Sequence, residues 1–557
     1  MRRFNLSSCV AMFFCLLLCT SMRMVTSLTS LRPTTPQNVL LIISDDLRAE
    51  IDALGFGCTA VKCHTPHLKN LSASTSTTTF TRAYVQQALC APTRNSFLTG
   101  RRPDTTKSWN FVNHFREALP HIKTLPQVFK DVANYSVFGT GKVFHPHLPP
   151  HWDPPSWDKA MYDGRALSWM YPSEPRCPEG NVWCGLNSTD VSDYDDLQVT
   201  QRALALLSNL TSKEKPWFLA VGFRKPHVQW RIPIQHLNNI PSNSVTLPKY
   251  PLFPKNSPSI AYHQPIGDFV EPFTDVLACG GLSNMEPNAS YPPHCQYKWR
   301  RAYHASVSFM DEQVGILMNA LIKHDVYDNT VVCFFGDHGW SLGEASEWEK
   351  FTNFEMAARV PLIIRAPWLK SGIGKMTRTL VELVDIMPTL IELATPATIV
   401  VPAGVEGTSL VPFMELKNSG GENKSGENKS ENKSVVDGKV VSGKTVVLTQ
   451  FPRCVTDWSA MWKRNDCDNV DRRNFTHMGL SLRTNRWRFT RWMQWDGELL
   501  MPKWRDDDDG LELYDHFNDD GLSMDGNYEH ENVALNFPNV VHNLTVLLEV
   551  VYAKETS

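Results

Sequence analysis

The sequence lacks an excess of either charge. Its 55 Lys and Arg residues stand against 58 Asp and Glu residues, which gives a formal net charge of −3. A chain so close to neutrality has no global field that would attract nucleic acid, and it carries no basic tail. We therefore expect no nucleic-acid partner, and a polyanionic substrate would have to be held by local cations.

The sequence also lacks an apolar run of the roughly 20 residues that a membrane span needs. An apolar run covers only residues 10–19; two arginines precede it, and small residues follow at Ser21 and Ser27. This order predicts a cleaved signal peptide over residues 1–27, with an uncleaved anchor as the alternative. We expect a secretory-pathway protein without stable membrane insertion.

Asparagine sequons agree with that route. Outside the predicted signal they occur at Asn70, Asn134, Asn187, Asn209, Asn288, Asn423, Asn428, Asn432, Asn474 and Asn543. Their density is typical of a glycosylated lumenal protein.

Cysteine is moderately rare, at 13 residues. Ten remain beyond the predicted signal, and most of them form close pairs that suit local disulfides in an oxidising compartment. The expected pairs are Cys58 with Cys63, Cys177 with Cys184, Cys279 with Cys295, and Cys454 with Cys467. Cys333 lies within an apolar run and is expected to be a buried thiol, whereas Cys90 is left needing another explanation.

Four short apolar runs are each followed by polar side chains. The runs are Val39–Ile43, Tyr135–Phe138, Trp217–Val221 and Val331–Phe335. The residues that follow them are Asp45 and Asp46, Lys142 and His145, Lys225 and His227, and Asp337 and His338. Parallel strands deliver their carboxyl ends to one edge of a sheet, where α/β proteins bind ligands. One such pattern is an ordinary strand-end turn, but four together predict a single site.

Helical patterns lie between these runs, at residues 200–210 and 303–323. The alternation predicts an α/β fold: a large domain with a mainly parallel sheet sandwiched by helices, over residues 36–417. The Gly-, Ser-, Lys- and Glu-rich segment 418–444 is expected to be a glycosylated linker or loop. A smaller C-terminal α+β subdomain is expected over 445–557.

Two elements are expected within this subdomain. Residues 478–484 and 487–492 read as paired strands, and residues 540–551 read as a closing helix. The acidic run 506–509 could suggest a calcium site, but such a charge run is usually a solvated turn.

The motif around Cys90 carries the chemistry. Cys90-Ala91-Pro92-Thr93-Arg94 matches Cys-x-Pro-x-Arg, and Leu98-Thr99-Gly100-Arg101 follows it. The chain resembles type I sulfatases of the alkaline phosphatase superfamily, and within them those acting on 2-sulfated iduronate. The resemblance runs from residue 39 to about 534 through the segments LLIISDDLRAE, QQALCAPTRNSFLTGRRPDTT, GKVFHP, LAVGFRKPH, GDHGWSLGE and ELYDHFNDD.

The resemblance implies that Cys90 is converted to formylglycine by the formylglycine-generating enzyme. The hydrated aldehyde offers two hydroxyls, one to attack sulfur and one to expel sulfate afterwards. The resemblance also implies one Ca²⁺, held by Asp45, Asp46, Asp337, His338 and the residue made from Cys90. Carboxylate oxygens suit such a hard cation, although an imidazole is a less typical ligand. Without a cation the two adjacent aspartates would repel each other; capping of a helix is their alternative role.

The remaining roles also come from the resemblance. Arg94 would orient the nucleophile, and Lys142, Lys225 and Lys350 would neutralise the sulfuryl oxygens. His145 would accept the proton during sulfate release and His227 would protonate the leaving oxygen, but spacing does not decide which histidine does which.

The implied substrate is a sulfated glycosaminoglycan, with the 2-O-sulfate of terminal iduronate in dermatan sulfate and heparan sulfate as the target. Another carbohydrate sulfate, or a phosphoester, is the alternative substrate; a glycosaminoglycan-binding pseudoenzyme is the non-catalytic alternative. The implied location is the lysosome, with secretion as the other outcome. Two departures concern substrate recognition: Ala345 follows Glu344 where relatives have His, and Arg224 replaces a His.

Overall fold

The structure is a computed structural model. It describes residues 33–54, 63–158, 176–264, 269, 273–369, 374–415, 433–436, 439–504, 509–519, 524 and 528–556. The predicted signal peptide, Cys58 and Asp506 to Asp508 lie outside the described residues.

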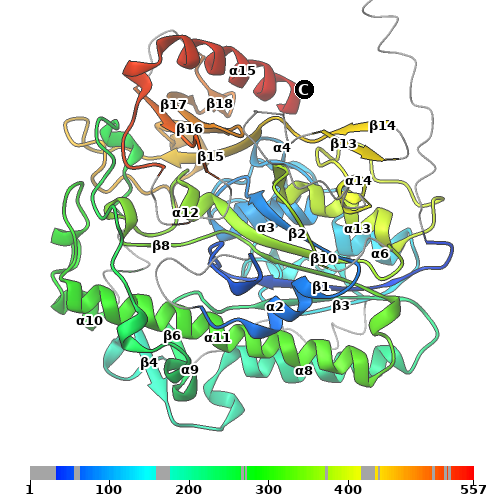
Figure 1. Ribbon diagram of the computed structural model, residues 1–557. Helices are drawn as coiled ribbons and strands as arrows, with labels where there is room; N and C mark the ends of the chain where they lie inside the picture. The colour runs from blue at the N-terminus through cyan, green and yellow to red at the C-terminus, as the bar shows by residue number, and fades with distance from the viewer. Residues whose placement is uncertain are drawn as a thin grey trace, which may run out of the picture.

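An eight-stranded sheet forms the centre of the molecule (Figure 1). Its main path runs β11-β2-β10-β7-β1-β5-β3, and β12 pairs with β2. The four apolar runs predicted as strands form its contiguous parallel part, which confirms the predicted fold class. These strands are β7 (Thr330–Gly336), β1 (Asn38–Ser44), β5 (Trp217–Phe223) and β3 (Ser136–Gly141). The others are β2 (Thr77–Tyr84), β10 (Arg359–Arg365), β11 (Lys375–Thr377) and β12 (Val381–Glu382).

Helices cover both faces of this sheet, as Figure 1 shows. One face packs on α2 (Pro66–Ala73), α8 (Asp195–Thr211) and α11 (Pro293–Lys323), and the other on α3 (Cys90–Thr99), α6 (Leu125–Asp131) and α13 (Ile386–Ala394). Successive strand residues point to opposite faces, so Leu40 and Ile42 join the first core while Val39, Leu41 and Ile43 join the second. Burial of both faces explains why β1 is continuously apolar instead of alternating.

The two predicted helices extend further than their apolar patterns. The pattern at 200–210 belongs to α8, which begins at Asp195, and the pattern at 303–323 belongs to the 31-residue α11. The added residues at the start of α11 are mostly polar or aromatic, so an apolar repeat does not mark them.

A second, antiparallel sheet lies in the C-terminal region. It contains β15 (Val447–Arg453), β16 (His477–Arg483), β17 (Trp487–Asp496), β18 (Met501–Pro502) and β19 (Gly510–Asp515). The predicted strand pair is confirmed as β16 and β17, and the predicted closing helix is α15 (Pro538–Thr556). In Figure 1 this sheet and α15 lie together at the top, away from α8 and α11.

Of the segment 418–444, expected to be a linker or loop, the structure describes residues 433–436 and 439–444. Within it β13 (Lys433–Val436) pairs with β14 (Lys439–Ser442), and the Lys444 ammonium contacts the buried carboxylates of Glu382 and Asp385. The domain boundaries themselves stay a prediction.

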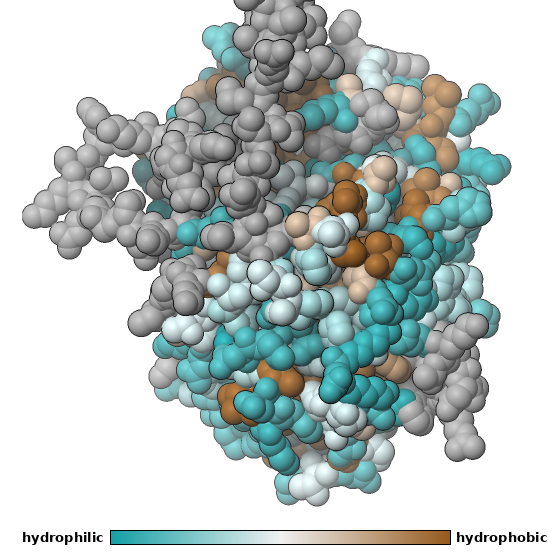
Figure 2. Space-filling model, turned by 90° about the vertical axis from the view of Figure 1, so that its right-hand side faces the viewer, coloured by the Kyte–Doolittle hydropathy of each residue, from teal (hydrophilic) through white to brown (hydrophobic). Residues whose placement is uncertain are grey.

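Three expected disulfides are present: Cys177–Cys184, Cys279–Cys295 and Cys454–Cys467. Cys333 is a buried free thiol, as expected, and Cys90 is likewise buried and in no disulfide. The described sequon asparagines are all exposed, namely Asn70, Asn134, Asn187, Asn209, Asn288, Asn474 and Asn543. Among the described residues, no helix is long and apolar enough to cross a membrane. On the face in Figure 2, hydrophobic residues form small groups among hydrophilic ones.

Candidate active site

The carboxyl ends of the parallel strands meet at one edge, as predicted. Ser44, the last residue of β1, pairs with Gly336 of β7 on one side and Phe223 of β5 on the other. Asp45 and Asp46 therefore emerge beside Asp337, whose Oδ1 accepts a hydrogen bond from the Asp46 backbone N–H at 3.1 Å. Asp46 adopts a left-handed backbone conformation (φ 62°), a costly geometry that often occurs at functional sites.

Cys90 begins helix α3, which follows β2 to the same edge of the sheet. All ten residues of this helix are buried. Pro92 fits its first turn because a backbone N–H there has no helical partner. Arg94 comes one turn after Cys90 and therefore lies on the same helix face. The spacing of the motif thus places a thiol and a guanidinium side by side.

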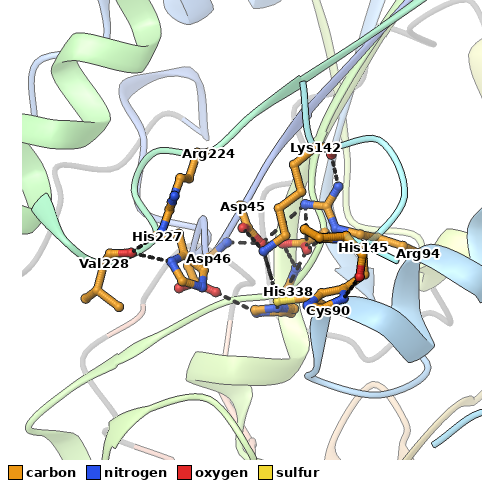
Figure 3. Close-up of polar contacts among 12 residues, drawn as sticks. Asp45, Asp46, Cys90, Arg94, Lys142, His145, Arg224, His227, Val228 and His338 are labelled. Carbon is orange, nitrogen blue, oxygen red and sulfur yellow. Dashed lines mark hydrogen bonds and ion pairs between the residues drawn. The ribbon is translucent and has the colours of Figure 1, made fainter. Parts of the chain in front are cut away.

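Four groups from separate segments surround the Cys90 sulfur, and three of them, His338, Asp45 and Lys142, are labelled in Figure 3. The Sγ atom lies 3.3 Å from Nε2 of His338 and 3.5 Å from Oδ1 of Asp45. It also lies 3.5 Å from Nζ of Lys142 and 3.5 Å from Nζ of Lys350. The thiol is 1% exposed and is not in a disulfide, so a reactive group at this position is enclosed by charges of both signs.

Three cationic side chains, Lys142, Lys350 and Arg94, contact three carboxylates. The carboxylates belong to Asp45, Asp46 and Asp337. Lys142 contacts the Asp45 carboxylate, and Lys350 Nζ lies 3.0 Å from Oδ1 of Asp46. Three carboxylates and three cations leave the cluster nearly neutral when all are ionised. Binding of an anionic ligand would therefore gain from one further positive charge.

Burial sets the proton affinities of these carboxyls. Burial opposes ionisation of Asp45, but the charges of Lys142 and Arg94 outweigh it and hold the pKa of Asp45 well below its ordinary value. Burial, reinforced by the nearby Asp45, raises the pKa of Asp46 to about 7 despite Lys350. Burial also raises the pKa of Asp337 well above its usual range, although Arg94 opposes this. The site thus favours the ionised form of Asp45 and disfavours ionisation of Asp46 and Asp337.

The residues fit a divalent cation. Ligand atoms of Asp45, Asp46, Cys90 and His338 all lie within 4.8 Å of one another, and Oδ2 of Asp46 is buried without a hydrogen-bond partner. Carboxylate oxygens of this kind suit a hard cation such as calcium. Asp337, also predicted as a ligand, uses its carboxylate for Arg94 and for the backbone N–H groups of Asp46 and His338.

The histidines of the site share one orientation. In each of them Nδ1 faces the carbonyl of the next residue. Nδ1 of His145 lies 3.0 Å from the Pro146 carbonyl, Nδ1 of His227 lies 2.5 Å from the Val228 carbonyl, and Nδ1 of His338 lies 3.1 Å from the Gly339 carbonyl. A carbonyl only accepts, so in each neutral ring Nδ1 carries the proton and Nε2 keeps its lone pair. Burial lowers the pKa of all three well below the ordinary value, helped by Lys142 or Lys350. Each ring therefore presents a basic or metal-binding nitrogen.

Lys142 and Lys350 contact the Cys90 sulfur, whereas the contacts of the Lys225 ammonium are with other groups. Its ammonium donates to the Gln229 carbonyl at 2.7 Å and lies 3.9 Å from Oδ1 of Asp195. Its backbone is fixed at the strand edge, since Ser44 Oγ donates to its carbonyl at 2.8 Å.

Asp196 is a functional candidate that the sequence interpretation missed. Its two carboxylate oxygens accept the backbone N–H groups of Arg224 at 2.7 Å and Lys225 at 3.0 Å, which fixes the segment leading to His227. Asp196 is fully buried near the start of α8. The pair Asp195-Asp196 ahead of an apolar helical pattern was the available signal, because buried acidic residues need partners.

A second missed pair supports the loop that carries Lys350. Arg48, just after the two aspartates, lies 3.1 Å from Oε1 of Glu344, and both side chains are buried. Glu344 also accepts from Arg300 at 3.1 Å. Residues Glu349 and Phe351 on either side of Lys350 have positive φ, so the loop needs such support. Ala345, one of the two departures noted in the sequence, has a φ of 54°.

A further buried group with ligand-like side chains lies elsewhere, at Glu355, His516 and Glu529. Arg488 contacts both of its carboxylates, and Arg483 lies 3.3 Å from Glu355. Because arginines already supply the positive charge, this group is an ion network, not a second cation site.

Comparison with known proteins agrees with this geometry. A family model described as Sulfatase matches residues 37–396. The chain is 31% identical over 537 residues to iduronate 2-sulfatase of Homo sapiens, covering 87% of this chain and 92% of that protein. It is 32% identical over 539 residues to iduronate 2-sulfatase of Mus musculus, with the same coverage. Among solved structures it resembles the phosphonate monoester hydrolase SpPMH from Silicibacter pomeroyi, with a TM-score of 0.63, 18% identity, and coverage of 93% and 96%.

Proposed function

The chain belongs to the sulfatase family, and from this premise we propose that it removes the 2-O-sulfate of terminal iduronate in dermatan sulfate and heparan sulfate. Hydrolysis of glycosaminoglycan sulfate esters is supported by the identity to iduronate 2-sulfatase over most of the chain. The position of the sulfate and the identity of the sugar are the parts that need testing.

The single observation that carries the proposal is the environment of Cys90. A group at its Sγ position lies within 3.5 Å of two ammonium groups, a carboxylate and an imidazole. The thiol itself is a poor nucleophile there, because burial and the nearby Asp45 raise the pKa of Cys90 to about 12. We therefore propose that Cys90 is converted to formylglycine, which supplies one hydroxyl to attack sulfur and a second whose deprotonation expels sulfate.

The partner for this conversion would be the formylglycine-generating enzyme. Cys90 is 1% exposed in the folded chain, so a modifying enzyme could reach it only before folding. Folding then encloses the new group beside its charged neighbours.

The chain's own residues divide the remaining work. Lys142 and Lys350 balance the charge of the sulfuryl oxygens, an electrostatic contribution that often dominates such transfers. Arg94 fixes Asp45 and Asp337, and thereby orients the helix that begins at Cys90. Lys225, whose ammonium donates to the Gln229 carbonyl, would also help to neutralise the sulfuryl oxygens.

The two histidines would move protons through Nε2. His145 has that nitrogen unprotonated, which suits it to take the proton of the second hydroxyl as the C–O bond to sulfate breaks and a carbonyl forms. His227 can serve as the acid only after Nε2 is protonated, a form that a bound anionic sulfate favours. An acidic compartment favours it too, in line with a lysosomal location reached by the secretory route.

The cation that we propose is calcium, held by Asp45, Asp46, Asp337, His338 and the residue made from Cys90. When bound, it would polarise the sulfate oxygens and favour ionisation of the hydroxyl. The unpartnered Oδ2 of Asp46 is the observation that supports it most directly.

Two measurements test the proposal together. Mass spectrometry of the Cys90 peptide should find formylglycine in place of cysteine. Turnover of defined disaccharides should be fastest with 2-sulfated iduronate. Activity on a 6-sulfated sugar alone would point to a different carbohydrate sulfatase, and activity on phosphoesters alone would reject sulfate ester hydrolysis.

A further inference from the structure

An aromatic ring covers one face of His145. The rings of Phe111 and His145 are stacked, with centroids 4.6 Å apart and planes inclined by 25°. On its edge, the imidazole contacts the Pro146 carbonyl through Nδ1 at 3.0 Å. Two contacts of different kinds therefore define the plane of the ring and the direction of Nε2.

Phe111 is itself held between the catalytic residues and the C-terminal region. It packs against a buried cluster of Leu89, Phe351 and Phe451. Leu89 precedes Cys90 and Phe351 follows Lys350, so the cluster that Phe111 packs against contains the immediate neighbours of two residues at the site. Phe451 belongs to β15 of the C-terminal sheet.

The residue before it, Asn110, ties this loop to the segment that follows Cys467. The Asn110 side chain is 1% exposed, and its Nδ2 donates to the carbonyls of Cys467 at 2.7 Å and Val470 at 2.6 Å. The backbone N–H of Phe111 donates to the Asp468 carbonyl at 3.2 Å. Cys467 is fixed in turn by its disulfide with Cys454. A C-terminal segment thus sets the position of a loop at the site.

We propose that Phe111 is a positioning residue for His145, and that Asn110 acts through Phe111 by docking its loop on the disulfide-closed segment 454–470. This inference rests on the proposed function only in taking His145 as the group that accepts a proton. It extends that function by making the C-terminal region a requirement for correct proton transfer.

The physical reason is orientation. With Phe111 removed, the imidazole keeps one hydrogen bond and can rotate about it, so Nε2 no longer points in one direction. Misplacement of a reacting group by about 1 Å costs on the order of 100-fold in rate. We expect kcat to fall by about 10- to 100-fold while KM does not rise, because the sulfate still meets Lys142 and Lys350.

The experiment compares three test variants and one control variant with wild type. Phe111→Leu keeps the apolar contact with the Leu89, Phe351 and Phe451 cluster but removes the ring, and Phe111→Tyr restores a ring. Asn110→Ala releases the loop. Val112→Ala, at an exposed position in the same loop, is the matched control and should leave activity unchanged.

A second readout is independent of turnover. Diethyl pyrocarbonate acylates exposed imidazole nitrogens, and peptide mass spectrometry follows its rate at His145. Phe111→Leu and Asn110→Ala should raise this rate several-fold, whereas Phe111→Tyr and Val112→Ala should not. Thermal unfolding confirms that each variant is folded.

A double variant tests the order of action. If Asn110 acts through Phe111, Asn110→Ala combined with Phe111→Leu should be no slower than Phe111→Leu alone. Additive losses would overturn the proposed order, and a raised KM with unchanged kcat would show that Phe111 binds substrate instead. An unchanged rate at His145 in Phe111→Leu would refute positioning. Absence of sulfatase activity in wild type would instead refute the proposed function, while the acylation comparison could still be made.

Discussion

Arg94 and Asp337 form a buried ion pair that joins helix α3, which begins at Cys90, to the sheet. Both Nε and Nη2 of Arg94 lie 2.9 Å from Oδ2 of Asp337, and neither side chain is exposed. Nη2 also lies 3.2 Å from Oδ1 of Asp45. One guanidinium therefore fixes the start of α3 against the ends of β1 and β7.

Replacing Arg94 by Met should impair both stability and turnover. The change leaves the carboxylate of Asp337 buried without its cation, which typically costs about 3–5 kcal/mol. It also frees Asp45 and the start of α3, so we expect kcat/KM to fall by at least about 100-fold. Urea unfolding and sulfate release measure the two effects.

Arg486→Met is the matched control. Arg486 pairs with Asp515 at 2.8 Å, but its side chain is 46% exposed, and exposed pairs contribute at most about 1 kcal/mol. Equal destabilisation by both substitutions would contradict the structural role given to Arg94.

Cys90→Ser should abolish sulfatase turnover and leave the fold intact. Serine is close to cysteine in volume, so no cavity forms, but it offers one hydroxyl where the proposed mechanism needs two. Circular dichroism and thermal unfolding check the fold. Cys333→Ala, at the other buried thiol, should keep full turnover at a small cost in stability. Turnover retained by Cys90→Ser would reject the mechanism.

The sequence was sufficient to predict the four parallel strands of the central sheet, the polar groups that follow them, and the strand pair β16 and β17. Strands such as β1 and β7, buried on both faces, read as unbroken apolar runs, and the polar residues after them marked the edge where they meet. The position of Cys90 could be predicted because its motif is local.

Supporting residues could not be predicted in the same way. Asp196 meets Lys225 across 29 positions and Arg48 meets Glu344 across 296, so each contact depends on the fold and not on spacing. The same holds for Lys444, which lies in a polar, low-complexity stretch yet reaches Glu382 and Asp385.

Calcium should stabilise the protein through the carboxylates at the end of β1. A ligand that binds only the folded state adds about 2.7 kcal/mol at 100 times its dissociation constant. We therefore expect the unfolding midpoint to rise with calcium and fall with a chelator. Asp46→Asn should remove this dependence, because it replaces the unpartnered Oδ2 by an amide nitrogen or leaves a single neutral oxygen. Magnesium, which demands a smaller octahedral site, should stabilise less. A midpoint indifferent to calcium would reject the cation site.

Asp311 should make the fold more stable at acidic pH. It is 1% exposed, and burial raises its pKa to about 7 although the N–H groups of His67 and Leu68 at the start of α2 donate to it. The folded chain keeps this proton to a higher pH than the unfolded chain does. The stabilisation is thus complete below about pH 4, declines by at most about 1.4 kcal/mol per pH unit, and is lost above about pH 7.

Asp311→Asn isolates this contribution from other groups that titrate in the same range, including Glu512, whose pKa burial raises to about 6. Asparagine keeps the shape and one acceptor oxygen but does not ionise, so the unfolding midpoint of the variant should gain on wild type as pH rises from 5 to about 7. Asp190→Asn is the control, because hydrogen bonds from Ser192 lower the pKa of this exposed carboxylate. Asp190 is therefore ionised in both states across that range, and its substitution should shift the midpoint equally at every pH. A constant difference for Asp311→Asn would show that this carboxyl is ionised in the folded protein.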